Sequence, residues 1–278
     1  MMEGQWKIEF WGTRGSMAVS GKDFLKYGGD TSCVLLDWGY GLLVFDGGSG
    51  LAKLGKALAL AGEKRRVDIL LSHMHMDHIV GLLGFNLFYD KEARIHLYGI
   101  PGDGGSFKKS LETVVGSPYW PVGFKDFPAD IQFHQIQAGQ SFSIKEGSGA
   151  IKVSTLEGKH PGGSVLYRVD GHGRSVVYGL DCQLDEEMFG KMAEFSKNTQ
   201  VLIWDANFTA EDLRRHQDWG HSSWRQGISL RKAANGKKAV MTHFSWEYTD
   251  DFLTEQERLA VMEDEASLFA RERMELWV

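Results

Sequence analysis

The chain has 278 residues, of which 42% are hydrophobic and 24% charged, as in an ordinary globular protein. Its formal net charge of −6 argues against a nucleic-acid partner, because proteins that bind nucleic acid usually carry a basic face. Two cysteines are too few for a disulfide framework or a cysteine-rich zinc module. The N-terminus has no basic segment followed by an apolar run, and no stretch reaches the ~20 apolar residues of a membrane span, so we expect a cytoplasmic protein without a membrane segment.

Aromatic, β-branched and aliphatic residues gather in the first third of the chain, with glycine-rich turns between them, and this pattern predicts strands. Strands are expected at 5–11, 31–37, 41–46, 67–72 and 93–99. Helical spacing of alanine and leucine predicts a helix over 50–61, and 75–88 reads as a loop running into a helix. Residues 101–130 are irregular and predict a covering loop or a partial helix rather than core.

The second half repeats this plan of several strands followed by strand–loop–helix units. Strands are expected at 131–136, 141–144, 151–156, 164–169, 174–180, 201–206 and 237–243. Helices are expected at 184–195 and 223–234, with an amphipathic closing helix over 251–272. The pattern predicts one domain over 1–278, of α/β class, with two packed sheets and helices outside.

The sharpest feature is LSHMHMDH at 71–78, which follows a predicted buried strand. A strand that ends in a loop can point alternate side chains the same way, so His73 and His75 can share one metal ion. Asp77 and His78 then turn toward a second site at the start of the next helix. Imidazole nitrogens and carboxylate oxygens suit zinc, manganese or iron.

Two ions need more ligands than this loop supplies, and later strands offer them. The candidates are His160 in EGKHPGG, Asp181 in VVYGLDCQ and His243 in AVMTHFS. Asp181 and His243 each follow an apolar run, so each is expected at the carboxyl end of a strand, where α/β proteins commonly place ligand sites. Each alone would more often be a turn residue, so only their order and context together carry weight.

The order H-x-H-x-D-H, a distant histidine, a strand-end aspartate and a final histidine resembles the metallo-β-lactamase superfamily over nearly the whole chain. The resemblance implies a four-layer αβ/βα sandwich that holds two divalent ions (zinc or manganese, or else iron) along one edge. It implies that His73, His75 and His160 bind one ion, that Asp77, His78 and His243 bind the other, and that Asp181 bridges them. Asp46 in VFDGGSG matches the family aspartate that orients the ligand loop.

Three further segments look like the phosphodiesterase side of this superfamily, which includes ribonuclease Z: GTRGS at 12–16, YGGDTSCV at 27–34 and WGHSS at 219–223. By this resemblance His221 is a candidate proton donor or phosphate contact, with Ser222 as a second hydrogen-bond partner. The alternative is that His221 caps the helix starting near residue 223. Arg14 is a candidate contact to a substrate oxygen, or else an ion-pairing or surface arginine.

One segment departs from ribonuclease Z. At 201–212, Trp204 stands where that enzyme has a histidine and Asp205 stands at its glutamate, which argues against transfer-RNA processing. Tyr119 and Trp120 could stack on a ribose or base if 101–130 covers the site; the alternative is that they pack the covering loop.

We therefore expect a metal-dependent hydrolase that acts on a small cyclic or diester phosphate, and a homodimer is compatible with the resemblance. Asp77 would hold a metal ion and orient the nucleophile, and His221 would protonate the leaving alkoxide. A thioester or lactone hydrolase of the same fold is one alternative. A non-catalytic nucleotide- or metal-sensing module is the other.

Overall fold

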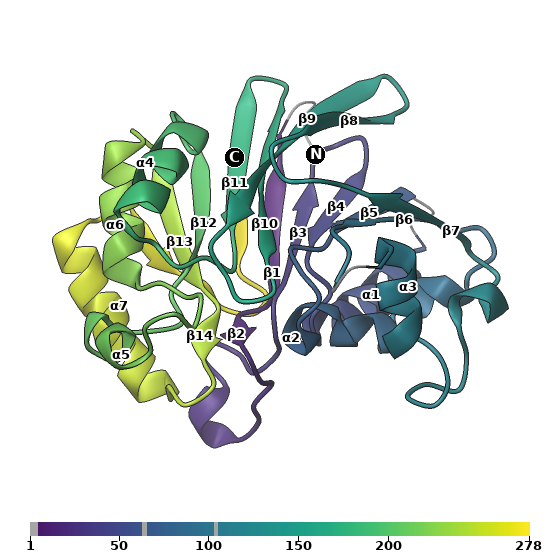
Figure 1. Ribbon diagram of the computed structural model, residues 1–278, viewed down its shortest axis with the longest axis horizontal. Helices are drawn as coiled ribbons and strands as arrows, with labels where there is room; N and C mark the ends of the chain where they lie inside the picture. The colour runs from purple at the N-terminus through teal and green to yellow at the C-terminus, as the bar shows by residue number, and fades with distance from the viewer. Residues whose placement is uncertain (1–4, 63–65, 103–104) are drawn as a thin grey trace.

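Two seven-stranded sheets pack face to face at the centre of the molecule, and helices cover the outer face of each (Figure 1). The computed structural model describes residues 5–62, 66–102 and 105–278. The α/β class and the four-layer αβ/βα sandwich that the resemblance implies are therefore confirmed. No helix in these ranges has both the length and the apolar run needed to cross a bilayer.

The first sheet is built mainly from the N-terminal half. Its strand order is β16 (Glu275–Trp277), β1 (Lys7–Gly12), β3 (Cys33–Asp37), β4 (Leu42–Phe45), β5 (Arg66–Leu70), β6 (Arg94–Gly99) and β7 (Asp130–Gln135). The four strands from β4 to β7 run parallel, so their carboxyl ends meet at one edge of the sheet.

The second sheet has the order β15 (Ser267–Phe269), β13 (Lys238–Thr242), β12 (Val201–Asp205), β11 (Arg174–Gly179), β10 (Ser164–Gly171), β9 (Gly149–Gly158) and β8 (Ser141–Glu146). The strands β11, β12, β13 and β15 are parallel, and β9 runs in the same direction because β10 is antiparallel to both of its neighbours. β2 (Arg14–Gly15) and β14 (Phe244–Ser245) form a short parallel pair, and β14 follows β13 almost directly in the chain.

Three apolar layers hold the sandwich together. The central layer lies between the sheets and includes Trp6, Phe45, Tyr167 and Val240. The second lies between the first sheet and its helices, α1 (Gly50–Ala61), η2 (Val80–Gly84), η3 (Asn86–Tyr89) and α3 (Phe107–Val114). The third lies between the second sheet and α4 (Glu186–Phe195), α6 (Trp224–Ala233) and α7 (Asp250–Glu263). The shorter elements are α2 (Met76–Ile79), α5 (Ala210–Arg215), η1 (Lys22–Phe24) and η4 (Phe124–Asp126).

Helix α1 forms where the sequence predicts it. Its buried residues Leu51, Leu54 and Leu58 recur at helical spacing and face the first sheet. The helix ends at Gly62, which adopts the left-handed conformation that suits a C-terminal glycine.

Three predicted segments differ in the structure. The closing helix ends at Glu263, and the rest of 251–272 holds strand β15, which pairs with β13. The predicted helix within 75–88 is only four residues of α2, followed by the 3₁₀ helices η2 and η3. Gly81 in η2 packs so closely on Gly48 that a side chain there would collide with the Gly48 carbonyl oxygen. Within 101–130, α3 buries Phe107 and Leu111 in the core layer, so this segment is more than a cover.

Candidate metal centre

The predicted ligands all follow the carboxyl ends of strands. The loop with His73, His75, Asp77 and His78 follows β5 of the first sheet. His160 follows β9, Asp181 follows β11 and His243 follows β13 of the second. These ends converge on one edge of the sandwich, so residues up to 170 positions apart form one cluster.

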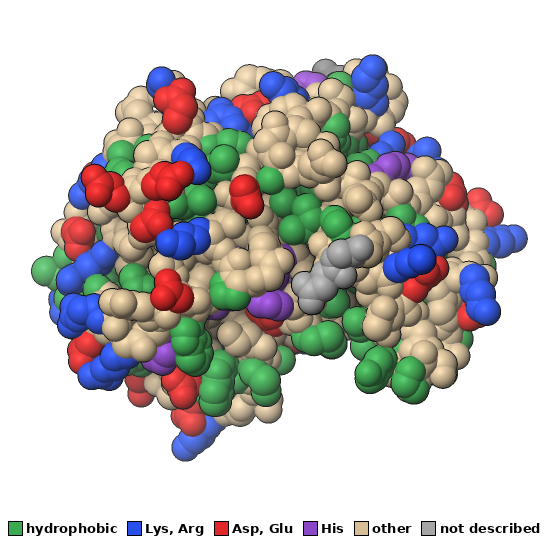
Figure 2. Space-filling view, viewed as in Figure 1, with side chains coloured by type: hydrophobic (Ala, Val, Ile, Leu, Met, Phe, Trp, Pro, Cys, Tyr) green, Lys and Arg blue, Asp and Glu red, His purple; other side chains and the backbone are tan. Residues whose placement is uncertain are grey.

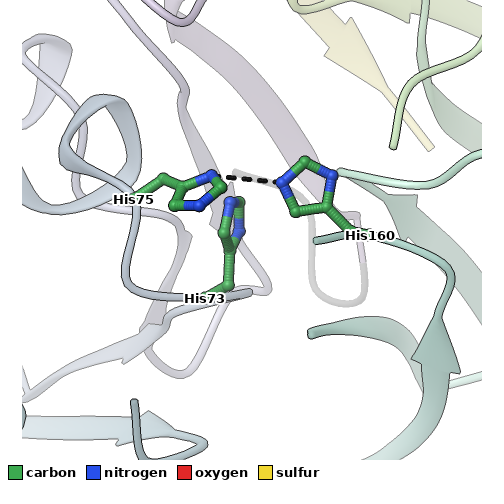
Figure 3. Close-up of side chains that lie close together, drawn as sticks. All are labelled: His73, His75 and His160. Carbon is green, nitrogen blue, oxygen red and sulfur yellow. Dashed lines mark hydrogen bonds between the residues drawn. The ribbon is translucent and has the colours of Figure 1, made fainter. Parts of the chain in front are cut away.

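Three histidines form the first ligand set (Figure 3). The rings of His73, His75 and His160 point toward one another, and His75 Nδ1 lies 3.1 Å from His160 Nε2. His73 Nε2 is buried and has no hydrogen-bond partner among the described residues. A buried ring nitrogen left without a partner, facing two other imidazoles, is an arrangement that a divalent cation would satisfy.

The second ligand set consists of Asp77, His78, Asp181 and His243. Between His78 Nε2 and His243 Nε2 the distance is 3.1 Å, and each of these nitrogens lies 3.2 Å from an oxygen of Asp77 and from an oxygen of Asp181. A tetrahedral site with ligand bonds of ~2.0–2.1 Å has edges of about 3.3 Å. The distances from the two imidazole nitrogens to each other and to the nearest oxygens of Asp77 and Asp181 are therefore close to the spacing that a zinc-sized ion requires.

Asp181 lies between the two sets. Its Oδ2 is 3.7 Å from His73 Nε2 and 4.0 Å from His160 Nε2, whereas its Oδ1 faces His243. One carboxylate thus reaches both groups of imidazoles, which is the geometry of a bridging ligand.

Hydrogen bonds to the Nδ1 atoms of His73 and His78 turn the opposite ring nitrogens toward the cluster. Asp46 Oδ2 accepts from His78 Nδ1 at 2.7 Å and from the hydroxyl groups of Ser72 and Tyr178. The Ser72 hydroxyl in turn contacts His73 Nδ1 at 2.9 Å. Because the Nδ1 atoms of His73 and His78 are engaged, their Nε2 atoms are directed at the cluster, the arrangement that orients and strengthens histidine ligands when an ion binds.

Strained backbone accompanies these contacts. Asp46 and His243 have φ angles of 59° and 62°, in the left-handed region that non-glycine residues rarely adopt. Gly220, with φ of 85°, accepts a hydrogen bond from His160 Nδ1 at 3.0 Å, and a Cβ atom there would lie 2.0 Å from that nitrogen. The WGHSS segment therefore supplies a glycine that orients a ligand, a contact that the sequence analysis missed.

Electrostatics favour a cation at this edge. Burial alone would lower the pKa of His243, but the carboxylates of Asp181 and its neighbours raise it to about 10. Burial would raise the pKa of Asp181, but the positive charges of His243 and His78 hold it well below its usual value. Without an ion, the carboxylates thus favour protonated His78 and His243, whereas burial lowers the pKa of His73, His75 and His160. A divalent cation in the second set would take the place of the protons on His78 and His243.

His221 lies beside the cluster with an oriented ring. Its Nδ1 is 3.0 Å from Asp205 Oδ2, and its ring centroid is 5.2 Å from those of His160 and His243. The helix α6 is capped by Ser223, whose side chain accepts from the backbone N–H of Gln226, so His221 is not needed as the cap. The structure thus brings His221 to the site and leaves its Nε2 for chemistry.

The two predicted substrate contacts are placed elsewhere. Arg14 is fully buried, and its guanidinium donates to the carbonyl oxygens of Gly28, Ser245 and Tyr248. Ser222 is also fully buried, and its hydroxyl donates to the carbonyl oxygen of Cys182 at 2.5 Å. Arg14 Nε and Nη1 and the Ser222 hydroxyl are therefore bound to backbone carbonyls, whereas Arg14 Nη2 has no hydrogen-bond partner among the described residues and lies 3.8 Å from Asp250 Oδ1. A direct substrate contact for either side chain stays a prediction.

The predicted stacking residues Tyr119 and Trp120 lie in the turn that follows α3. Tyr119 is 70% exposed. Among the described residues, no ring contact joins either side chain to the site histidines.

Comparison with protein families agrees with this geometry. The family model of the beta-lactamase superfamily domain matches residues 43–244, most of the chain. The chain therefore belongs to this superfamily, on its phosphodiesterase branch, and is a metal-dependent hydrolase that holds divalent metal ions.

Individual relatives lie at low identity. Ribonuclease Z of Picrophilus torridus is 27% identical over 314 residues, covering 99% of this chain and 96% of that protein. Ribonuclease Z of Bacillus subtilis (strain 168) is 26% identical over 238 residues, covering 71% of this chain and 76% of its own length. Among solved structures, the metallo-beta-lactamase fold protein YhfI from Bacillus subtilis has a TM-score of 0.71 at 19% identity, covering 99% of this chain and all of that one. Human short-form tRNase Z has a TM-score of 0.67 at 17% identity, covering 97% and 98%. At these identities the structural neighbours show a shared fold alone.

Proposed function

We propose that this protein is a phosphodiesterase that uses two divalent ions, zinc or manganese or else iron, to hydrolyse a small cyclic or diester phosphate. In this proposal the first ion is held by the histidine set, the second by Asp77, His78 and His243, and Asp181 bridges. The observation that carries the proposal is the Asp205–His221 pair beside the two ligand sets, because a phosphodiesterase must protonate an alkoxide leaving group.

Each residue has a chemical task in this scheme. Bound divalent ions supply Lewis acidity and lower the pKa of water to near neutrality. His221 gives a proton from Nε2 to the leaving oxygen, and Asp205 stabilises the imidazolium from the Nδ1 side. Asp77, which receives the Ser16 amide at 2.7 Å, is held in place to orient the attacking water.

A small substrate suits the surroundings of the site. A cavity of about 190 Å³ opens beside the first ligand set and is lined by His73, Met74, His75, Gly102, Pro161, Gly162 and Gly163. None of these lining residues is lysine or arginine. On the face shown in Figure 2, basic side chains lie mainly toward the periphery rather than around the central histidines. An uncharged arm of a small diester fits such a wall better than a polyanion does.

RNA is the second candidate substrate, and one observation favours it. The relatives that match over most of their length are ribonucleases Z, so the net charge of this chain does not exclude nucleic acid. A basic face is the feature that an RNA substrate would require, and the cavity wall does not supply it.

The test is hydrolysis of bis(p-nitrophenyl) phosphate by protein loaded with zinc or with manganese. We expect metal-dependent cleavage that is lost in Asp181→Ala and kept in Asp90→Ala, a matched change at a partly exposed aspartate outside the ligand sets. Comparing a 2′,3′-cyclic nucleotide with a precursor transfer RNA then separates the two substrate classes. Cleavage of a thioester or lactone but of no phosphodiester would overturn the proposal. Binding of a nucleotide without any turnover would favour a sensing module instead.

A further inference from the structure

We infer that Arg14 is a positioning residue for the ion held by Asp77, His78 and His243. It acts through the loop that it anchors and touches neither ion nor substrate. The inference rests on the proposed assignment of the two ligand sets.

Arg14 occupies a fully buried position where three chain segments meet. Its Nε donates to the Gly28 carbonyl at 2.7 Å, and its Nη1 donates to the carbonyls of Tyr248 at 2.6 Å and Ser245 at 3.3 Å. Asp250 Oδ1 lies 3.8 Å from Nη2 and supplies a counter-charge. A planar fork with fixed donor directions can bind carbonyls from two segments at once, whereas an ammonium group cannot span them in the same way.

The anchored loop holds one ligand of the second ion directly. Two residues after Arg14, the backbone N–H of Ser16 donates to Asp77 Oδ2 at 2.7 Å. Ser16 has a φ angle of 63°, so this amide reaches Asp77 only while the loop is kept in a strained turn. Releasing the loop would free Asp77 from its only hydrogen bond outside the ligand sets among the described contacts.

The same loop presses against a second ligand. Gly15 lies so close to His243 that a Cβ atom would come within 2.6 Å of its ring. The Phe244 N–H donates to the Thr13 carbonyl at 2.9 Å, and β2 pairs with β14 immediately after His243. The Arg14 side chain adds a further bond between β2 and β14, because it donates to the carbonyl of Ser245 at the end of β14.

No comparable connection links Arg14 to the first ion. The described contacts of His75 and His160 run to each other, to His73, to Gly220, to His221 and to Asp181, and none of these contacts involves residues 13–16. Loss of the anchor should therefore affect the two ions unequally, which is a result that general destabilisation would not produce.

The experiment is metal titration of full-length Arg14→Lys protein against a chromophoric chelator. We expect wild-type affinity for the first ion and at least tenfold weaker affinity for the second. The visible spectrum of the cobalt-loaded protein should change in the same variant, because it reports ligand geometry. With bis(p-nitrophenyl) phosphate at fixed metal concentration, kcat should fall while KM stays unchanged.

Arg168→Lys is the matched control. Arg168 also donates to two backbone carbonyls, those of Phe195 and Lys197, but lies away from the site. The Arg168 variant should lose stability without a selective change in its affinity for the second ion. Equal affinity of Arg14→Lys and wild type for both ions would overturn the inference. A raised KM with unchanged kcat would also overturn it, because that result would mean that Arg14 contacts the substrate.

A second variant covers the case in which Arg14→Lys does not fold. Gly15→Ala leaves the arginine in place but drives a methyl group against His243, so it should weaken the second ion selectively. Unchanged affinity for that ion in Gly15→Ala would also count against the inference. Failure of the proposed function is distinguishable, because it would appear in the wild-type protein as missing turnover with both ions bound.

Discussion

Replacing Asp205 with asparagine tests the proton-donor pair with little change in shape. Asp205 is fully buried; its Oδ1 accepts from the Asn207 N–H at 3.0 Å and its Oδ2 faces His221 Nδ1 at 3.0 Å. In Asp205→Asn we expect the amide oxygen to keep the shorter Asn207 bond, so that the NH₂ group faces His221 and also the Cys182 N–H, which donates to Oδ2 at 3.3 Å in the wild type. The ring then meets a donor where it had an acceptor, and the imidazolium loses its counter-charge.

The size of the effect follows from this single contact. A hydrogen bond to a charged group contributes about 1.5–3 kcal/mol. Because each ~1.4 kcal/mol of barrier is a factor of ten in rate, cleavage that needs His221 as an acid should slow by about 10- to 150-fold. Cleavage that expels p-nitrophenolate, a stable anion, should change little, since that leaving group needs no proton.

The assay compares kcat on bis(p-nitrophenyl) phosphate with kcat on a cyclic nucleotide whose leaving group is a sugar alkoxide. Metal content must be measured in both proteins, since Asp205 Oδ1 is also 3.8 Å from His243 Nδ1. Asp212→Asn, a similar change outside the ligand sets, is the control. An equal fall on both substrates would refute the acid assignment and would mean that Asp205 acts through the metal ligands.

Three further outcomes follow from the structure. Asp46→Asn should weaken metal affinity about 10- to 100-fold by removing the acceptor that orients the ligand loop, and chelator titration with unchanged affinity would contradict this. Gly220→Ala should selectively weaken the first ion, because its Cβ would meet His160, and an unchanged first affinity would argue against that contact. The metal-free protein should lose stability as pH falls from about 6.5 to about 4, since burial lowers the pKa of His96 to about 4 and lowers that of His134, so the unfolded chain binds more protons in this window. The urea midpoint of unfolding should change less with pH in His96→Gln than in wild type. An equal pH dependence in both proteins would mean that other groups cause the loss of stability.

The clustering of the candidate ligands was predictable because much of its signal is local. Four candidate ligands lie within six residues, and two of the other three, Asp181 and His243, follow apolar runs of strand length. Parallel strands then place those ends at one edge whatever the details of packing. The orienting position of Asp46 followed from the same family pattern, and the structure shows its bond to His78.

Arg14 shows why the surroundings were harder to predict. Its carbonyl acceptors lie 14, 231 and 234 positions away in the chain, so no local pattern distinguishes an arginine that anchors a loop from one that binds phosphate. Ser222 is similar, because its acceptor Cys182 lies 40 positions away. Burial, which decides between these alternatives, depends on the assembled sandwich.

The predicted end of the closing helix was wrong for a related reason. Amphipathic spacing continues past Glu263, but β15 gains a ladder with β13, and β16 gains one with β1. Both strands pair with partners far away in sequence, so helical periodicity alone could not find the end of α7. Asp264 ends the helix in an extended conformation and directs the chain toward these pairings.

The two sheets contribute unequal halves of the metal centre, and this bears on how the site forms. The first sheet supplies Asp46 and the loop from His73 to His78, whereas the second supplies His160, Asp181 and His243. Neither sheet supplies a complete ligand set, so both ligand sets depend on the apolar layer that packs the two sheets together. Because Asp77 and Asp181 bring two carboxylates close together in the buried second set, bound cations would join the sheets as well as serve the chemistry. Both proposed ions would take ligands from both sheets, but only the second set is also linked through the Arg14 loop, which contacts Asp77 and lies against His243.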